Sequence, residues 1–151
     1  MAIAPNTTFV ANSVLTAAQQ NAFGFSTCQY GSATTSATTI TTITTTITLS
    51  SFTAIASRNY KITYLEPDLF CTSGSGVATL TIKNGATVLQ QVLATVNVTN
   101  DATATLQCIT QFSAGATTLT ASLTYTGTGS LTASRSATKV AFALVEDIGP
   151  S

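Results

Sequence analysis

Apolar and polar residues alternate along most of the chain after Phe25, which is the period of a β-strand with one buried face. In the segment 60–66, Tyr60, Ile62 and Tyr64 fall on one face; in 77–83, Leu80 and Ile82 point the same way. Further strands are predicted at 86–98, 102–112, 117–125 and 139–148. Turn residues separate these segments and no crossover helices lie between them. The pattern therefore predicts an all-β fold, an antiparallel β-sandwich, with a jelly roll as the preferred form.

The dipeptide Asn84-Gly85 stands between two of the predicted strands. Asn and Gly accept the positive φ angles of a type I′ turn, so this pair predicts a tight β-hairpin.

A threonine-rich run, TTSATTITTITTTITL, occupies residues 34–49 and predicts one or two strands. The alternation of a strand would place Ile43, Ile47 and Leu49 on one face, because all three are at odd-numbered positions, and Ile40 on the other. We therefore expect a β-bulge near Thr41–Thr42. A mucin-like stalk would contain proline within such a run, and an ice-binding face would keep a strict repeat. The run has neither, and we interpret it as strands.

The first 24 residues form a separate unit in this interpretation. Residues 1–15 lack periodicity and charge, which indicates an extended arm. The arm is too apolar for a solvated tail, so it packs either on its own sandwich or on a neighbouring subunit; we favour the neighbour. The predicted boundaries are 1–24 for this attachment element and 25–151 for the sandwich. Its candidate partner-binding residues are Ile3, Phe9, Val10, Val14, Leu15 and Phe23.

One short helix is predicted at Thr16–Phe23. Thr16 and Gln19 have the spacing of a capping box, and Gly24 suits the position after a helix C-terminus. A helix of about two turns does not persist alone in water, so it must lie against something.

Threonine makes up about a fifth of the 151 residues, and only 7% are charged, against about 25% in typical domains. Lys+Arg and Asp+Glu number five each, so the net charge is zero. Five scattered cations cannot form the basic face that nucleic-acid binding needs. Low net charge offers little repulsion between copies, so we expect a homo-oligomer, with a trimer favoured.

The chain has no histidine, the usual acid–base residue, and its few carboxylates suggest no active site. Glu66 and Asp68 flank Pro67, which predicts a strand end and turn with both side chains in solvent. Glu146 and Asp147 are adjacent in a strand and should point to opposite faces. A glycosidase-like pair of Glu66 with Glu146 stays open. We expect no enzyme activity, no metal and no cofactor.

Three cysteines, Cys28, Cys71 and Cys108, are odd in number and widely spaced. They are predicted to be free thiols, buried or half-buried. The longest apolar run is too short to span a membrane, and the start lacks the basic region of a secretory signal. We therefore expect no membrane partner, and free thiols in a reducing cytoplasm.

Three segments carry a resemblance to a known family. VLTAAQQNAFGF (14–25) resembles the opening segment of small tailed-bacteriophage virion proteins, and AFALVEDIGPS (141–151) resembles their closing strand. SFTAIASRNYKITY (51–64) is similar to a strand pair between the two. The resemblance implies a non-enzymatic β-sandwich on the virion, of head-decoration, minor tail or fibre type. This chain departs from the family in its threonine run and in lacking tryptophan.

The resemblance implies two roles. The first is a capsid decoration protein that binds the major capsid protein or other virion subunits outside the head and stabilises it. The alternative is a minor tail or fibre-tip subunit that binds a host-surface receptor, including a glycan. A flat apolar face and an arm favour decoration, whereas exposed aromatic residues in a pocket would indicate receptor binding. A bacterial adhesin module is a third possibility, which the lack of a secretory signal disfavours.

Overall fold

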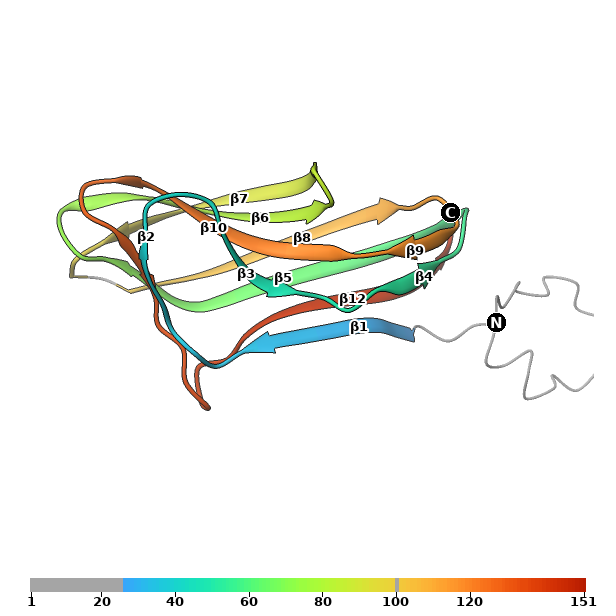
Figure 1. Cartoon of the computed structure of the whole chain (residues 1–151), viewed down its shortest axis with the longest axis horizontal. Helices are drawn as coiled ribbons and strands as arrows, with labels where there is room; N and C mark the ends of the chain where they lie inside the picture. Colours follow the sequence, from blue (N-terminus) through green and yellow to red (C-terminus); the bar gives the residue numbers. More distant parts are fainter. Residues whose placement is uncertain (1–25, 100) are drawn as a thin grey trace, which may run out of the picture.

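The computed structural model describes residues 26–99 and 101–151, which form two packed antiparallel sheets with no helix in this part of the chain (Figure 1). The strands in chain order are β1 Ser26–Ala33, β2 Ala37–Ile40, β3 Thr44–Thr48, β4 Phe52–Ala54, β5 Arg58–Cys71, β6 Ser75–Asn84, β7 Thr87–Asn97, β8 Ala102–Gln111, β9 Gly115–Thr117, β10 Leu119–Gly127, β11 Leu131–Ala133 and β12 Ala141–Pro150. The predicted arm and the helix at Thr16–Phe23 lie outside the described residues.

The strand order is that of a jelly roll. In sheet A, β5 pairs with β8 on one side and with β12 and β11 on the other, and β1 and β2 lie beyond these two. Sheet B has the order β3-β10-β6-β7, and the short β4–β9 pair extends its β3–β10 side. The segments β1/β2, β3/β4, β9/β10 and β11/β12 are each one strand of the sandwich that is interrupted, so the fold has eight strands. The first of these eight (β1/β2) pairs with the last (β11/β12) and the second (β3/β4) with the seventh (β9/β10). The third (β5) pairs with the sixth (β8), and the fourth (β6) with the fifth (β7). This nested pairing confirms the predicted sandwich and its jelly-roll form.

The core lies between the two sheets and follows the predicted alternation. Tyr60, Ile62 and Tyr64 of β5 are buried together, as are Leu80 and Ile82 of β6. The rings of Phe52, Tyr60 and Phe112 form a cluster with centroid separations of 5.4, 5.8 and 5.9 Å. These aromatic contacts join the two sheets at the end where β5 begins.

The predicted hairpin is present, but its turn is not type I′. Asn84 pairs with Thr87 and is the last residue of β6, so the two turn residues are Gly85 and Ala86. Of these, Gly85 alone has a positive φ, 57°. Type I′ needs positive φ at both central residues, whereas a glycine at the first of them fits type II′.

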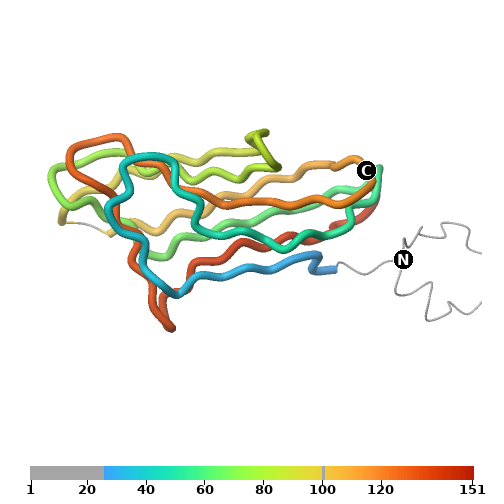
Figure 2. The backbone as a smooth tube through the Cα atoms, in the orientation of Figure 1, coloured from blue at the N-terminus to red at the C-terminus, as the bar shows by residue number. Residues whose placement is uncertain are grey.

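The threonine-rich run forms two strands, and the bulge expected near Thr41–Thr42 is wrong. At that point the chain leaves sheet A after β2 and enters sheet B at β3, which is the bend between these strands in Figure 2. Ile43 lies in this crossing and is 51% exposed. The bulge lies further on, at Thr46, because Thr45 pairs with Ser122 while Ile47 pairs with Ala121.

Thr39 has a φ of 58°, a left-handed conformation that a β-branched residue rarely adopts. We expect Thr39→Gly to stabilise the protein by about 0.5–1 kcal/mol, because it relieves strain of about 1–2 kcal/mol and adds about 0.5–1 kcal/mol of backbone entropy cost. The measurement is the midpoint of urea unfolding. Thr38→Gly, at an exposed neighbour without positive φ, should be destabilising, and equal effects of both changes would contradict the assignment of strain to Thr39.

Candidate functional site

Among the described residues, eight of the ten charged side chains form ion pairs with one another. The pairs are Arg58–Asp147, Lys61–Glu146, Arg135–Glu66 and Lys139–Asp68. Lys83 and Asp101 are the two charged residues outside them. Since most charge is neutralised within the fold, the molecule presents little net charge to any partner.

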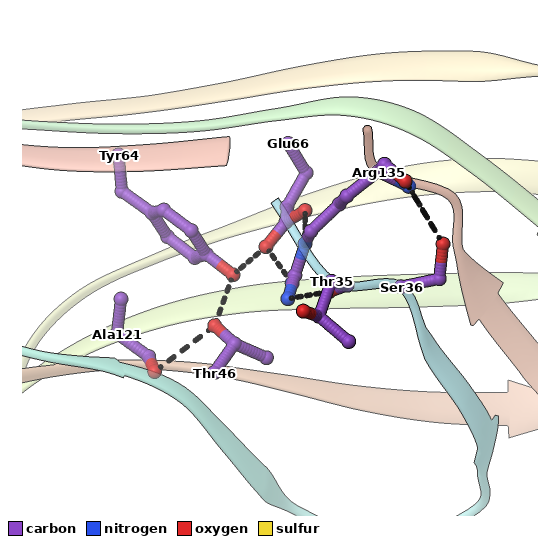
Figure 3. A network of polar contacts seen from close by, with 7 residues as sticks. All are labelled: Thr35, Ser36, Thr46, Tyr64, Glu66, Ala121 and Arg135. Carbon is purple, nitrogen blue, oxygen red and sulfur yellow. Dashed lines mark hydrogen bonds and ion pairs between the residues drawn. The ribbon is translucent and has the colours of Figure 1, made fainter. Parts of the chain in front are cut away.

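The Arg135–Glu66 pair is at the centre of a buried polar network (Figure 3). Glu66 lies on β5 and is fully buried. Arg135 follows β11 and donates from Nη2 to Oε1 at 2.5 Å and from Nε to Oε2 at 3.0 Å. This is the bidentate geometry in which guanidinium and carboxylate bind most strongly.

The network connects the two sheets. Tyr64 donates its hydroxyl to Glu66 Oε1 at 2.5 Å and lies 2.9 Å from Thr46 Oγ1, which donates to the carbonyl of Ala121 in sheet B (Figure 3). Burial, together with the nearby Glu66 carboxylate, raises the pKa of the Tyr64 hydroxyl well above its usual value. Thr46 reaches this position because it is the bulged residue of β3.

Arg135 also holds the loop between β1 and β2 in place. Its Nη1 donates to the Thr35 carbonyl, its backbone N–H donates to Ser36 Oγ, and Ser36 Oγ donates back to the Arg135 carbonyl. Both oxygens of Glu66 therefore accept hydrogen bonds from the protein itself. The network thus joins β5, the segment after β11 and the loop between β1 and β2.

The prediction that Glu66 and Asp68 lie in solvent at a strand end is wrong. Strand β5 continues through Pro67 to Cys71 by a bulge, since Glu66 pairs with Ala104 but Leu69 pairs with Ala102. The bulge accommodates the proline, which cannot donate to the ladder. Asp68 is buried and accepts from Lys139 Nζ, which raises the pKa of that lysine.

Glu146 and Asp147 do point to opposite faces, as predicted. Asp147 is buried, with Oδ2 2.5 Å from Nε of Arg58, whereas Glu146 is half-buried and lies 3.4 Å from Nζ of Lys61. Glu66 is turned to the interior of the sandwich and Glu146 to the outer side of sheet A. The fold does not bring these two carboxylates together as a glycosidase-like pair.

The outer side of sheet A carries apolar side chains from all four of its long strands, and we call it the apolar face. Tyr30 is 56% exposed and Ile109 65% exposed. The Tyr30 ring stacks on Phe142 with centroids 6.1 Å apart. Half-buried Leu65, Phe142 and Leu144 add to the face, and the polar side chains of Thr63, Thr105 and Gln107 lie among them. Only the Lys61–Glu146 pair interrupts it with charge among the described residues.

The outer side of sheet B is different, because hydroxyl groups line it. The register places Thr48 beside Thr120, Thr45 beside Ser122, Ser122 beside Thr81, and Thr124 beside Thr79. Gln91 covers part of this surface and donates to Thr81 Oγ1 at 3.1 Å. The threonine richness of the sequence thus supplies the hydroxyl groups of this side, which we call the hydroxyl face. The face also carries Lys83, beside Thr120, and two exposed apolar side chains, Val88 and Leu93.

The cysteines are free, as predicted, with Cys71 buried and Cys28 and Cys108 half-buried. Burial raises the pKa of the Cys28 and Cys108 thiols, which makes both poor nucleophiles at neutral pH.

A shallow depression beside Cys108 is lined by Lys61, Gln107 and Ile109 and contains no aromatic side chain. In the described residues, no group of three His, Cys, Asp or Glu side chains could hold a metal ion, and no helix could span a membrane.

The candidate arm residues, from Ile3 to Phe23, lie outside the described residues and stay a prediction. What sequence reasoning missed is the network around Glu66. The available signal was the scarcity of charge. In a chain with so few charged residues, a carboxylate next to a proline could have been predicted to form a specific ion pair. Its partner Arg135 is 69 residues away, and no spacing rule connects the two.

Comparisons with known proteins add no information on function to what the structure shows. No protein-family model and no curated protein matches the chain. A xylan-binding domain, CBM22-1 of Paenibacillus barcinonensis Xyn10C, is 10% identical, with 81% of this chain and 87% of that chain covered and a TM-score of 0.29. The carbohydrate-binding module CBM6cm-2 of Cellvibrio mixtus lichenase 5A, solved with cellotriose, is 16% identical, with 82% and 95% covered and a TM-score of 0.33. TM-scores this low carry no information about ligand or activity.

Proposed function

We propose that this protein is a non-enzymatic structural component of a bacteriophage virion, and that it decorates the outside of the capsid. The virion assignment rests on the resemblance of residues 14–25, 51–64 and 141–151 to small tailed-phage virion proteins. The observation that supports decoration is the apolar face of sheet A, because decoration requires a broad surface for flat contact with a protein lattice.

The chain connects the arm to an edge strand of the apolar face. Residues 1–24 join the sandwich close to Ser26, the first residue of β1, and β1 is the edge strand that supplies Tyr30 to the face. An arm carrying Ile3, Phe9 and Val10 and a face carrying Tyr30 would together clamp neighbouring capsid subunits. Each large apolar side chain that becomes buried contributes about 1.5–3 kcal/mol, and many copies act together.

A non-enzymatic role agrees with the pairing of charges. Among the described residues, four of the five carboxylates have a basic partner, and the remaining one, Asp101, lies in the connection before β8. Acid–base catalysis needs a positioned titrating group with access to substrate. The ion pairs leave these carboxylates committed to the fold.

The alternative, a fibre tip that binds a host glycan, calls for aromatic side chains in a pocket. The depression beside Cys108 contains none, and the Tyr30–Phe142 stack lies on an open face. Apolar side chains on an open sheet surface suit contact with a protein better than capture of a small sugar, so decoration is the function we propose.

The test is the number of copies on purified particles and what removes them. We expect hundreds of copies per particle on a quantitative gel, and Tyr30→Asp should weaken binding to undecorated particles about tenfold or more, since 1.4 kcal/mol is a factor of ten. Thr124→Asp, on the hydroxyl face, is the matched control and should bind normally. Deletion of residues 1–15 should leave a soluble β-domain that no longer decorates.

A few to a few tens of copies per particle would instead indicate a tail subunit. Normal occupancy by the Tyr30→Asp protein would show that the apolar face is not the contact surface, and normal occupancy after deletion of 1–15 would show that the arm is not the anchor.

A further inference from the structure

Strand β8 has one unpaired edge. Within residues 26–99 and 101–151 it forms a ladder with β5 alone, between Ala102 and Gln111. Strand β7 lies near it but belongs to sheet B and forms no ladder with it. The backbone N–H and C=O groups of alternate β8 residues therefore point away from β5, as in any edge strand.

The features that protect other edges are missing from β8. Register shifts place a bulged residue in three other edge strands: Cys28 in β1, Thr46 in β3 and Leu89 in β7. A bulge disrupts the ladder locally, and charges and prolines likewise blunt an edge. Strand β8, ATATLQCITQ, has no bulged residue, proline or charged side chain of its own. Such an edge is a template for another strand.

We propose that β8 of one copy pairs with β8 of a second copy about a two-fold axis, as antiparallel strands, so that sheet A continues from one molecule into the other. Two identical antiparallel strands are complementary by symmetry, because each free N–H of one meets a free C=O of the other. The proposal rests on the strand pairing and burial of residues 26–99 and 101–151, and it does not depend on the virion role.

The side chains of β8 suit pairing with a second copy of the same strand. A two-fold axis brings the strand opposite itself, so a charge near the axis would lie against the same charge. The outward side chains of β8 are all exposed and uncharged: Thr103, Thr105, Gln107, Ile109 and Gln111. Lys61, which lies beside Ile109 on β5, is neutralised by its pair with Glu146. The edge therefore carries no charge that self-pairing would oppose.

The length of the strand sets the register. A pair centred on Gln107 spans residues 103–111, which is the whole strand except for Ala102 next to the connection from β7. In this register Ile109 of one copy lies beside Thr105 of the other, and such pairs of β-branched side chains favour sheet formation. Ile109, which is 65% exposed in the single copy, would lose part of that exposure.

Two-fold pairing has a consequence for the apolar face. Residues opposite one another in a ladder project to the same side of the sheet. The apolar faces of both copies therefore lie on one side of the extended sheet and form one larger face. The contact builds a dimer, and so differs from the trimer favoured on the ground of low charge alone.

The test is the oligomeric state of the full chain and its response to one charge on the edge. We expect a dimer by analytical ultracentrifugation, and Gln107→Lys should raise its dissociation constant about tenfold or more, because two like charges then meet at the axis. Thr95→Lys, at an exposed position on β7, is the matched control and should leave the dimer unchanged. Both side chains are exposed, so both variants should keep the far-UV circular dichroism of the original protein.

Mixed labelling identifies the paired edge. In a sample of labelled and unlabelled copies, isotope-filtered NMR contacts should join labelled β8 to β8 of an unlabelled copy. A monomer at all concentrations, or an oligomer that Gln107→Lys does not weaken, would overturn the proposal. Contacts of β8 with residues 1–25 of either copy would assign the edge to the arm and overturn it as well. None of these results bears on whether the protein decorates particles, which occupancy on particles measures.

Discussion

Replacement of Glu66 by alanine lowers the free energy of unfolding by about 3–5 kcal/mol, the cost of leaving one partner of a buried ion pair alone. Arg135 would remain buried without its carboxylate, and Tyr64 would lose the acceptor of its hydroxyl. Urea unfolding, monitored by far-UV circular dichroism, measures the change in the free energy of unfolding. A loss below about 1 kcal/mol, typical of surface pairs, would place Glu66 in solvent after all.

The matched control removes both charges. Glu66→Leu combined with Arg135→Met leaves no unpaired buried charge, and apolar replacements of buried ion pairs are often neutral or stabilising. The double variant should therefore be more stable than Glu66→Ala. Recovery will be incomplete, because the Thr35 carbonyl loses its contact with the guanidinium and the Tyr64 hydroxyl still lacks the carboxylate that accepts from it.

Two neighbouring carboxylates should respond very differently to the same change. Asp147→Ala is expected to cost about 3 kcal/mol, because it leaves Arg58 buried and unpaired. It also removes the acceptor of the Gly149 N–H. Glu146→Ala should cost less than about 1 kcal/mol, since its pair with Lys61 is half exposed and screened by solvent.

Urea unfolding of both variants measures the two losses in the free energy of unfolding and so tests this difference. Equal costs for the two variants would mean that Asp147 is not buried, and that β12 does not have the register that places it against Arg58. Because the residues are adjacent in one strand, each variant is the other's control for a general effect on β12.

The sequence predicted the parts of the fold that repeat along a strand. Alternation identified the buried side of β5 and β6 through Tyr60, Ile62, Tyr64, Leu80 and Ile82, and adjacency placed Glu146 and Asp147 on opposite faces. Such predictions succeed because a strand imposes its period of two on every residue within it.

The failures came where the period breaks. Pro67 suggested a turn, but β5 accommodates it with a bulge, and the threonine run changes sheet where a bulge was expected. The network of Glu66 depends on Arg135, on Tyr64 and on the bulged Thr46 of the opposite sheet. Contacts between residues so distant along the chain leave no mark on local spacing.

The nested strand order also governs when this chain can fold during its synthesis. Strand β12 lies between β1 and β5 and pairs with both, so the first described strand has no ladder partner until the last one exists. Sheet A therefore cannot close until the ribosome has released residues through Pro150. Contacts of such long range fold slowly, and a nascent chain in this state exposes unpaired, uncharged strands. Ribosomes that stall before residue 141 would leave an aggregation-prone fragment rather than a smaller folded domain.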